Sequence, residues 1–145
     1  MKKYLAMLLA AIVLLSSTVA FAAMPNPDGT QASNYFKSYG MAVSATGSGK
    51  LYLTFSCTGV GTCDQLGVSC YRVQKKNSSG SWVDVTGDLS GSVSYNTTSH
   101  SFAKIFNGVK GETYRVKCTF TCTRTINGVK GTETKAYTSG TKTAT

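Results

Sequence analysis

The clearest alternation of hydrophobic and polar residues in this chain runs from residue 113 to residue 124. The hydrophobic residues occupy every second position: Tyr114, Val116, Cys118, Phe120 and Cys122. Basic residues and threonines fill the positions between them. Since successive side chains of a β-strand point to opposite faces of a sheet, this period of two predicts a strand with one buried and one exposed face. Such one-sided strands are typical of antiparallel sheets.

Weaker versions of the same pattern recur along the rest of the chain. Leu51, Leu53 and Phe55 alternate with polar residues and predict a second half-buried strand. Residues 58–65 are expected to form a loop, and the pattern over residues 86–98 is too weak to predict a strand. Further strands are predicted at residues 39–45, 68–75, 81–85, 101–106 and 132–137.

The strand at residues 101–106 has two candidate buried faces. Phe102 and Phe106 lie on one face, whereas Ala103 and Ile105 lie on the other. Both pairs are hydrophobic, so the alternation alone leaves the orientation of this strand open.

Turn residues separate the predicted strands. The pentapeptide Asn-Gly-Val-Lys-Gly occurs at residues 107–111 and again at residues 127–131. Asn-Gly adopts positive φ angles at low cost, so both copies are predicted to be turns. The chain outside its first 23 residues is rich in Thr, Ser, Gly, Val and Tyr, which are strand and turn formers. An all-β domain follows from this composition.

Residues 1–22 are expected to be a secretory signal peptide. Lys2 and Lys3 give a positive start, an apolar block follows over residues 5–15, and Ala20-Phe21-Ala22 matches the A-x-A cleavage pattern. The block is shorter than the roughly 20 apolar residues of a transmembrane helix. We therefore expect a helical signal segment cleaved near Ala22 and a secreted mature protein without a transmembrane segment.

The remaining chain, about 120 residues, has the size of one domain. Both prolines lie near its start, so residues 23–37 are expected to form an irregular N-terminal arm. The β domain is assigned to residues 38–140 and a C-terminal tail to residues 141–145.

The chain is basic, with a formal net charge of +9, which falls to +7 without Lys2 and Lys3. This charge favours anionic partners such as cell-wall polymers or acidic glycans. The basic residues of the mature part are dispersed, and only Lys75 and Lys76 are adjacent. No dense nucleic-acid-binding patch is therefore predicted, and we expect no specific nucleic-acid partner.

Two segments resemble parts of a fibronectin type III domain. Residues 70–85, with Asn77-Ser78-Ser79-Gly80 as the turn, are similar to that family's third-strand hairpin. Residues 109–116 resemble its turn into the sixth strand, and the resemblance implies that Tyr114 forms a tyrosine corner, with its hydroxyl bonded to upstream backbone. The expected fold is thus a single antiparallel β-sandwich of about seven strands, of fibronectin type III or immunoglobulin-like type.

The sequence departs from that family at two positions. Phe55 stands where the family usually has a Trp, and Lys110 replaces the usual Pro. The whole chain is also similar to a family of small secreted bacterial proteins of uncharacterised function, through its signal peptide, Gly80-Ser81-Trp82 and Tyr114-Arg115-Val116. That resemblance implies no catalytic residues.

All five cysteines lie in the expected secreted part, where disulfides are common. Cys118 and Cys122 would lie roughly 13 Å apart in one strand, at about 3.3 Å per residue, which is too far for a disulfide. The sandwich model brings Cys57, Cys63, Cys70 and Cys122 to one end of the domain. We favour a link from Cys57 to Cys118 or to Cys122.

Two other states of the cysteines stay open. They could remain buried thiols that act as small apolar residues. They could also bind zinc, although the sequence has no C-x2-C spacing. The odd number leaves at least one thiol free or pairs two chains.

No motif for catalysis or cofactor binding is present. His100 is the single histidine and is expected on the solvent side of a strand. Residues 47–50 lack the Ser or Thr that a phosphate-binding loop requires after its Lys. We therefore expect a protein that is not an enzyme and that carries no cofactor and no metal.

The leading hypothesis is a secreted, non-enzymatic binding or surface-associated module for an anionic wall polymer or glycan. Trp82, in a short edge hairpin, is the expected ligand contact. Eight aromatic residues could form either a sugar-stacking platform or ordinary packing contacts: Tyr35, Phe36, Tyr39, Tyr52, Tyr71, Trp82, Tyr95 and Tyr137. The alternative is a structural subunit that assembles through edge strands or an intermolecular disulfide. The oligomeric state does not follow from the sequence.

Overall fold

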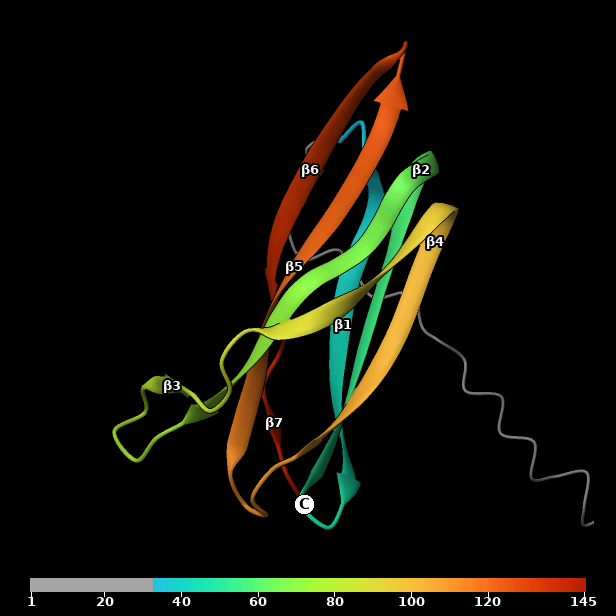
Figure 1. Cartoon of the computed structure of the whole chain (residues 1–145). Coiled ribbons are helices and arrows are strands. Elements are labelled where there is room, and N and C mark those ends of the chain that lie inside the picture. The colour runs from blue at the N-terminus through green and yellow to red at the C-terminus, as the bar shows by residue number, and fades with distance from the viewer. Residues whose placement is uncertain (1–32) are drawn as a thin grey trace, which may run out of the picture.

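The computed structural model describes residues 33–145, and within this part the protein is all-β, as predicted (Figure 1). Seven antiparallel strands form one curled sheet. The strands are β1 (Phe36–Gly47), β2 (Lys50–Lys76), β3 (Trp82–Asp84), β4 (Leu89–Asn107), β5 (Thr113–Ile126), β6 (Val129–Thr138) and β7 (Lys142–Thr143). The expected signal peptide and residues 23–32 of the expected arm lie outside the described residues.

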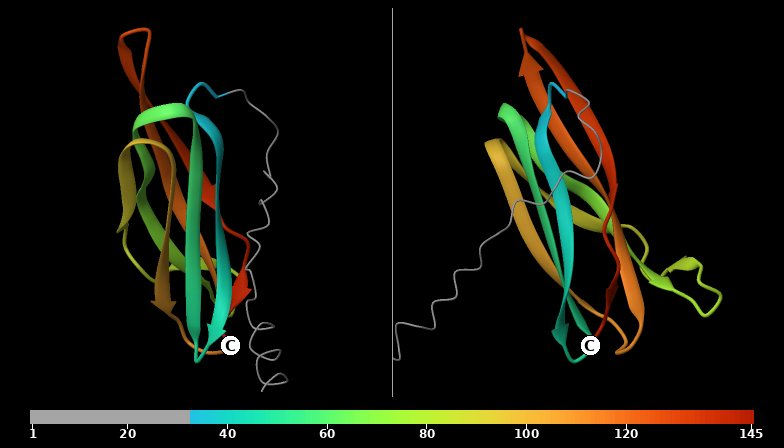
Figure 2. Two further views of the ribbon diagram at one scale, coloured as in Figure 1. Left: turned by 90° about the vertical axis from the view of Figure 1, so that its right-hand side faces the viewer. Right: turned by 180° about the vertical axis from the view of Figure 1, so that it is seen from behind.

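Strand β2 is the centre of the sheet. Its first half, residues 50–58, pairs with β1 on one side and with residues 99–107 of β4 on the other. Its second half, residues 65–75, pairs with β5 and with the first part of β4. β3 pairs with the end of β2, whereas β6 and β7 pair with β5. Figure 2 shows how β2 and β4 bend together, so that the sheet closes over its own inner face.

The predicted loop at residues 58–65 is wrong, because β2 continues through it. The ladder passes from the pair Thr58 and Ser99 to the pair Cys63 and Thr97, with a register shift between them. Gly61 has a φ of 132° in this bend, a backbone angle that favours glycine. The structure also extends β4 over residues 89–98, where no strand was predicted. This part of β4 pairs with β2 alone, and its half-exposed position explains its weak hydrophobic pattern.

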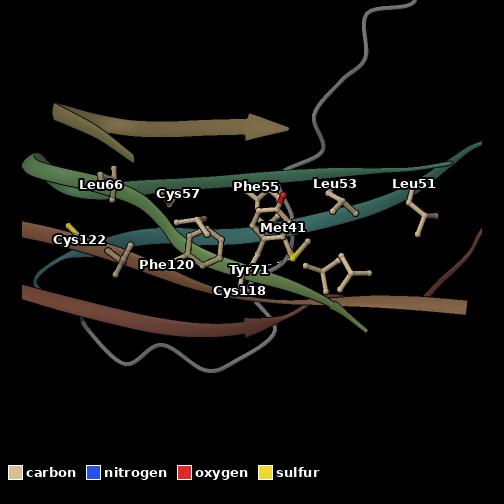
Figure 3. Close-up of a cluster of buried hydrophobic side chains, with 14 of the residues drawn as sticks. Met41, Leu51, Leu53, Phe55, Cys57, Leu66, Tyr71, Cys118, Phe120 and Cys122 are labelled. Carbon is tan, nitrogen blue, oxygen red and sulfur yellow. Dashed lines mark hydrogen bonds between the residues drawn. The ribbon is translucent and has the colours of Figure 1, made fainter. Parts of the chain in front are cut away.

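The hydrophobic core lies between the two halves of the curled sheet (Figure 3). Side chains of β1 meet those of β5 although the two strands are not hydrogen-bonded neighbours. The Met41 Sδ atom lies 3.8 Å from Cys118 Sγ, and the Tyr39 and Phe120 rings are 5.5 Å apart. All five hydrophobic residues of the alternation in β5 are buried, as predicted.

The orientation left open at residues 101–106 is also decided. Phe102 stacks on Phe55 with ring centroids 4.5 Å apart, whereas Ile105 is 63% exposed. The Phe102 and Phe106 face is therefore the one that packs on the core.

The expected C-terminal tail is part of the sheet. Lys142 and Thr143 form β7 and pair with Tyr114 and Thr113 of β5. Ala144 is buried, and its N–H donates to the Glu112 carbonyl.

Replacing Phe55 with Ala should lower the free energy of unfolding by about 3–5 kcal/mol, because removal of this 1% exposed ring leaves a cavity. Urea denaturation followed by circular dichroism measures the loss. Ile105→Ala is the control and should change stability by less than about 0.5 kcal/mol. Equal losses at the two positions would contradict the assigned faces of β2 and β4.

Candidate functional site

A groove of about 410 Å³ crosses β2, β5 and β6. Two cross-strand rows form its floor. The strand register places Arg72, Lys117 and Thr138 in one row and Cys70, Thr119 and Ala136 in the next. Asp88, just before β4, and the alternate row of Tyr71, Cys118 and Tyr137 complete the lining. The groove thus offers hydroxyl, ammonium and carboxylate groups side by side.

Arg72 is the hub of the groove's ion pairs. Its guanidinium group lies 2.9 Å from an Asp84 oxygen and 2.7 Å from an Asp88 oxygen. The hydrogen bond from the Gln74 amide lowers the pKa of the Asp84 carboxyl, and the charge of Arg72 adds to this effect. Both carboxylates are thereby satisfied within the fold.

Trp82, the predicted ligand contact, lies beside this network. The Arg115 guanidinium carbon sits 4.4 Å from the centroid of the Trp82 ring, in a cation–π contact. Arg115 also donates to the Gln74 side chain at 2.8 Å. One face of the half-buried Trp82 ring is therefore covered, and the ring is held in place for contacts at its remaining surface.

The other aromatic residues do not gather into a platform. Phe36 and Tyr71 are buried, while Tyr35, Tyr39 and Tyr137 pack against the core. Among the eight, Tyr52 and Tyr95 are the ones with more than a third of their surface exposed, and they lie on different strands. Within residues 33–145, ordinary packing accounts for most of this set.

The structure assembles a basic pole that the sequence analysis missed. Three segments meet there: residues 47–50, residues 107–112 and residues 142–145. Main-chain hydrogen bonds of 2.8–3.0 Å join them, from Gly49 to Thr145, from Gly108 to Gly49 and from Gly111 to Ala144. Each segment carries one exposed lysine: Lys50, Lys110 and Lys142.

This basic pole lies at the end of the molecule marked C in Figure 1. Its one acidic side chain, Glu112, faces Lys75 at 3.5 Å. The three lysines are separated by 60 and 32 positions in the sequence, so no local motif reveals them. Only the hydrogen bonds between their segments place the three lysines at the same end of the molecule.

Tyr114 holds the 107–112 turn at this pole. Its hydroxyl accepts a hydrogen bond of 2.8 Å from the Val109 N–H. This is the contact to upstream backbone that the fibronectin type III resemblance implies. Its ring also packs against Phe106.

The five cysteines are all free thiols, and they occupy different environments. Cys63 Sγ and Cys122 Sγ lie 3.2 Å apart. Cys57 Sγ instead approaches the His100 carbonyl oxygen at 3.7 Å. Cys70 is half-buried in the groove, away from the end where we expected it to join the other thiols. No cysteine pair within residues 33–145 lies at disulfide distance, so neither favoured link of Cys57, to Cys118 or to Cys122, is present, and the sulfur that contacts Cys122 Sγ is that of Cys63.

No group of three His, Cys, Asp or Glu side chains within residues 33–145 is arranged to hold a metal ion.

The expected position of His100 on the solvent side is wrong. The bend of β4 turns Ser92 and Ser94 toward the ring, with Ser94 Oγ 2.7 Å from Nδ1 and Ser92 Oγ 3.2 Å from Nε2. The ring is half-buried and stacks near Phe102. Burial lowers the pKa of His100, so the neutral ring is favoured.

His100 does not activate the neighbouring Cys57 thiol. Cys57 is its cross-strand partner, but the thiol faces the His100 carbonyl, and burial raises the pKa of Cys57 to about 12. A Cys–His pair needs a thiol close to the ring and a low thiol pKa. Neither condition is met at Cys57.

No helix able to cross a bilayer occurs in the part of the chain that the structure describes. Comparison with family models, with curated proteins and with solved structures gives no match for this chain.

Replacing Tyr114 with Phe removes the acceptor for the Val109 N–H and should cost about 1–2 kcal/mol of unfolding free energy. Urea denaturation measures this loss. Tyr95→Phe is the matched control, since Tyr95 is 67% exposed, and it should leave stability unchanged. An equal effect of both substitutions would show that the Tyr114 hydroxyl does not hold the turn.

Titration of His100 by NMR should give a midpoint below 6.5 in the folded protein. Since the folded state binds the proton less readily than the unfolded state, His100 contributes stability above pH 6.5. That contribution is lost as the pH falls from 6.5 through the lowered pKa. The urea-unfolded protein is the control and should titrate near 6.5. A folded-state midpoint at or above that value would contradict the described burial.

Proposed function

We propose that this protein is a secreted, non-enzymatic binding module for a polyanionic chain, such as an acidic glycan or a cell-wall polymer. The basic pole carries the proposal, because three separate segments are hydrogen-bonded together and each presents an exposed lysine. A cluster of this kind raises the local concentration of an anionic polymer and binds it through several charges at once.

The distribution of the remaining charges supports the same function. Lys2, Lys3 and Asp28 lie outside the described residues, which leaves a formal charge of +8 from the total of +9. Of the five carboxylates in residues 33–145, four form ion pairs inside the fold, with Arg72, Lys75 and Lys135. Most lysines therefore face solvent without a neighbouring carboxylate to neutralise them.

The groove supplies the hydrogen-bonding groups that a polymer of sugar or polyol units requires. Lys117 lies in its floor, between the Arg72 side chain and the hydroxyl of Thr138. Trp82, fixed under Arg115, stands at the neighbouring β3 hairpin. We assign the electrostatic attraction of the polymer to the basic pole, and the selectivity between different polymers to the groove.

We further infer that the curled sheet is a two-layer sandwich of the fibronectin type III or immunoglobulin-like type. The strand pairing supports this. If the two halves of β2 are counted as two strands, the first groups with β1 and the end of β4, and the second groups with β5 and β6. The same grouping, strands A, B and E against C, F and G, is typical of such sandwiches. We also propose that the chain is related to the small secreted bacterial proteins that its sequence resembles.

A second candidate function is assembly through a sheet edge. Within residues 33–145, β6 pairs with β5 along its ten residues and leaves its other edge without a strand partner. Exposed edges are sites for strand addition. Lys130, Glu133 and Lys135 lie on this strand, and such charges act against edge pairing. Polymer binding is therefore favoured over assembly.

The binding proposal is tested with heparin, poly(glycerol phosphate) and neutral dextran immobilised on a sensor surface. Replacing Lys50 and Lys110 with Ala should weaken binding to the anionic polymers by roughly tenfold to thirtyfold, since each lysine contributes about 1 kcal/mol near an anionic surface. When the salt concentration is raised from about 50 to about 200 mM, the affinity of the unaltered protein for the anionic polymers should decrease but remain measurable.

Lys37 and Lys130 provide the matched control, because both are exposed and neither lies in the three segments of the pole. Replacing these two removes the same charge and should weaken binding less than about threefold. Equal losses of affinity in the two double variants would show that net charge alone explains the binding. The basic pole would then have no specific role in it. Trp82→Ala and Lys117→Ala should alter the preference between heparin and poly(glycerol phosphate). Concentration-dependent oligomers without polymer binding would favour the assembly function.

A further inference from the structure

Two buried thiols from distant parts of the chain face each other inside the core. Cys63 lies in the bend of β2 and Cys122 in β5, and both are 0% exposed. Their Sγ atoms are 3.2 Å apart, although 59 positions separate them in the sequence. A disulfide bond has a length of about 2.05 Å, so the two sulfur atoms need to approach by only about 1 Å.

The bend of β2 is built around the Cys63 sulfur. Gly59 lies directly beside it, and a Cβ atom at that position would overlap with Cys63 Sγ. The Gly61 carbonyl oxygen is 3.4 Å from the same sulfur. Glycine at position 59 is therefore required for Cys63 to point inward, toward β5.

Cys122 is held in the complementary orientation. Its neighbour across the ladder is Leu66, which is fully buried, so the Cys122 side chain shares the core face of the sheet. Cys122 Sγ lies 3.6 Å from the Tyr35 carbonyl oxygen, at the start of the described chain. Both sulfurs are thus held in place by backbone atoms of β2 and of Tyr35, which directly precedes β1.

The other three thiols have different neighbours. Cys118 Sγ faces the Met41 thioether at 3.8 Å, and Cys57 Sγ faces the His100 carbonyl at 3.7 Å. Cys70 is half-buried and lines the groove. None of these contacts brings a second sulfur as close as the pair in β2 and β5.

We propose that Cys63 and Cys122 form an intramolecular disulfide in an oxidising environment, while Cys57, Cys70 and Cys118 stay reduced. The oxidant is a low-molecular-weight disulfide such as oxidised glutathione. The Cys122 thiolate attacks it and releases one glutathione thiolate, and the Cys63 thiolate then attacks Cys122 Sγ of the mixed disulfide and releases the second. The two thiol protons end on the two released thiolates, so the protein loses two electrons and two protons.

The burial of both sulfurs sets when this exchange takes place. A low-molecular-weight disulfide does not reach them in the closed fold, and burial raises the pKa of Cys122 to about 12. The link therefore forms while the bend of β2 is still open during folding. Once formed, it resists reductants until the protein is unfolded.

The experiment begins with the protein refolded in a buffer of oxidised and reduced glutathione, followed by alkylation without reduction. Trypsin alone leaves Cys57, Cys63 and Cys70 in one peptide, so cleavage before Asp64 and after Phe120 is added. Mass spectrometry should then find one linked pair of peptides, one with Cys57 and Cys63 and the other with Cys122. Fragmentation between Cys57 and Cys63 should place the bond on Cys63.

The variants give a second measurement that does not depend on peptide mapping. The oxidised protein should melt on the order of 10 °C above its reduced form, because a link closing so long a loop restricts the unfolded chain. Cys63→Ser and Cys122→Ser should abolish this difference, whereas Cys57→Ser, Cys70→Ser and Cys118→Ser should keep it. If either of the first two variants fails to fold, the mapping of the unaltered protein still decides.

Five alkylated thiols after refolding would overturn the proposal. A bond to Cys57, Cys70 or Cys118, or a disulfide between two chains, would do the same. The state of the cysteines is measured independently of polymer binding, which the lysine variants test separately.

Discussion

The pairing of β2 on both of its edges is the constraint on which this structure depends. The strand is 27 residues long, four of the other six strands pair with it directly, and the remaining two, β6 and β7, pair with β5. Because its ladder with β4 resumes after the register shift at residues 58–63, both strands bend together. That bend turns one sheet over its own hydrophobic face, encloses the core and sets Cys63 against β5.

The exterior follows from the same pairing. Since the turns at residues 47–50 and 107–112 end strands that are hydrogen-bonded to each other, they meet at one end of the molecule. β7 adds the third segment by pairing with β5. Glu112, the one acidic side chain at this end, is paired with Lys75, whereas Lys50, Lys110 and Lys142 are exposed there. Lysines that are dispersed in the sequence therefore lie at one end of the folded protein.

The repeated pentapeptide shows that local sequence alone does not determine the conformation of a turn. In residues 127–131, Asn127 and Gly128 both have positive φ and form the tight hairpin turn of β5 and β6. In residues 107–111, the positive φ lies at Gly111 instead. There Gly108 hydrogen-bonds Gly49, and Val109 donates to the Tyr114 hydroxyl. The same five residues adopt different turns because tertiary hydrogen bonds act on one copy.

The sequence by itself determined the all-β class, the buried face of residues 114–122 and the hairpin turn at Asn127, because these depend on neighbours along the chain. It did not determine the bend of β2, the orientation of Phe102 or the half-buried position of His100, since each depends on a strand distant in sequence. For the candidate site, local motifs singled out Trp82 and Tyr114, and the structure places Trp82 against Arg115 and Tyr114 at the turn of residues 107–112. The lysine pole and the Cys63–Cys122 pair required the tertiary structure, because both depend on segments that lie far apart in the sequence and meet only through strand pairing and the bend of β2.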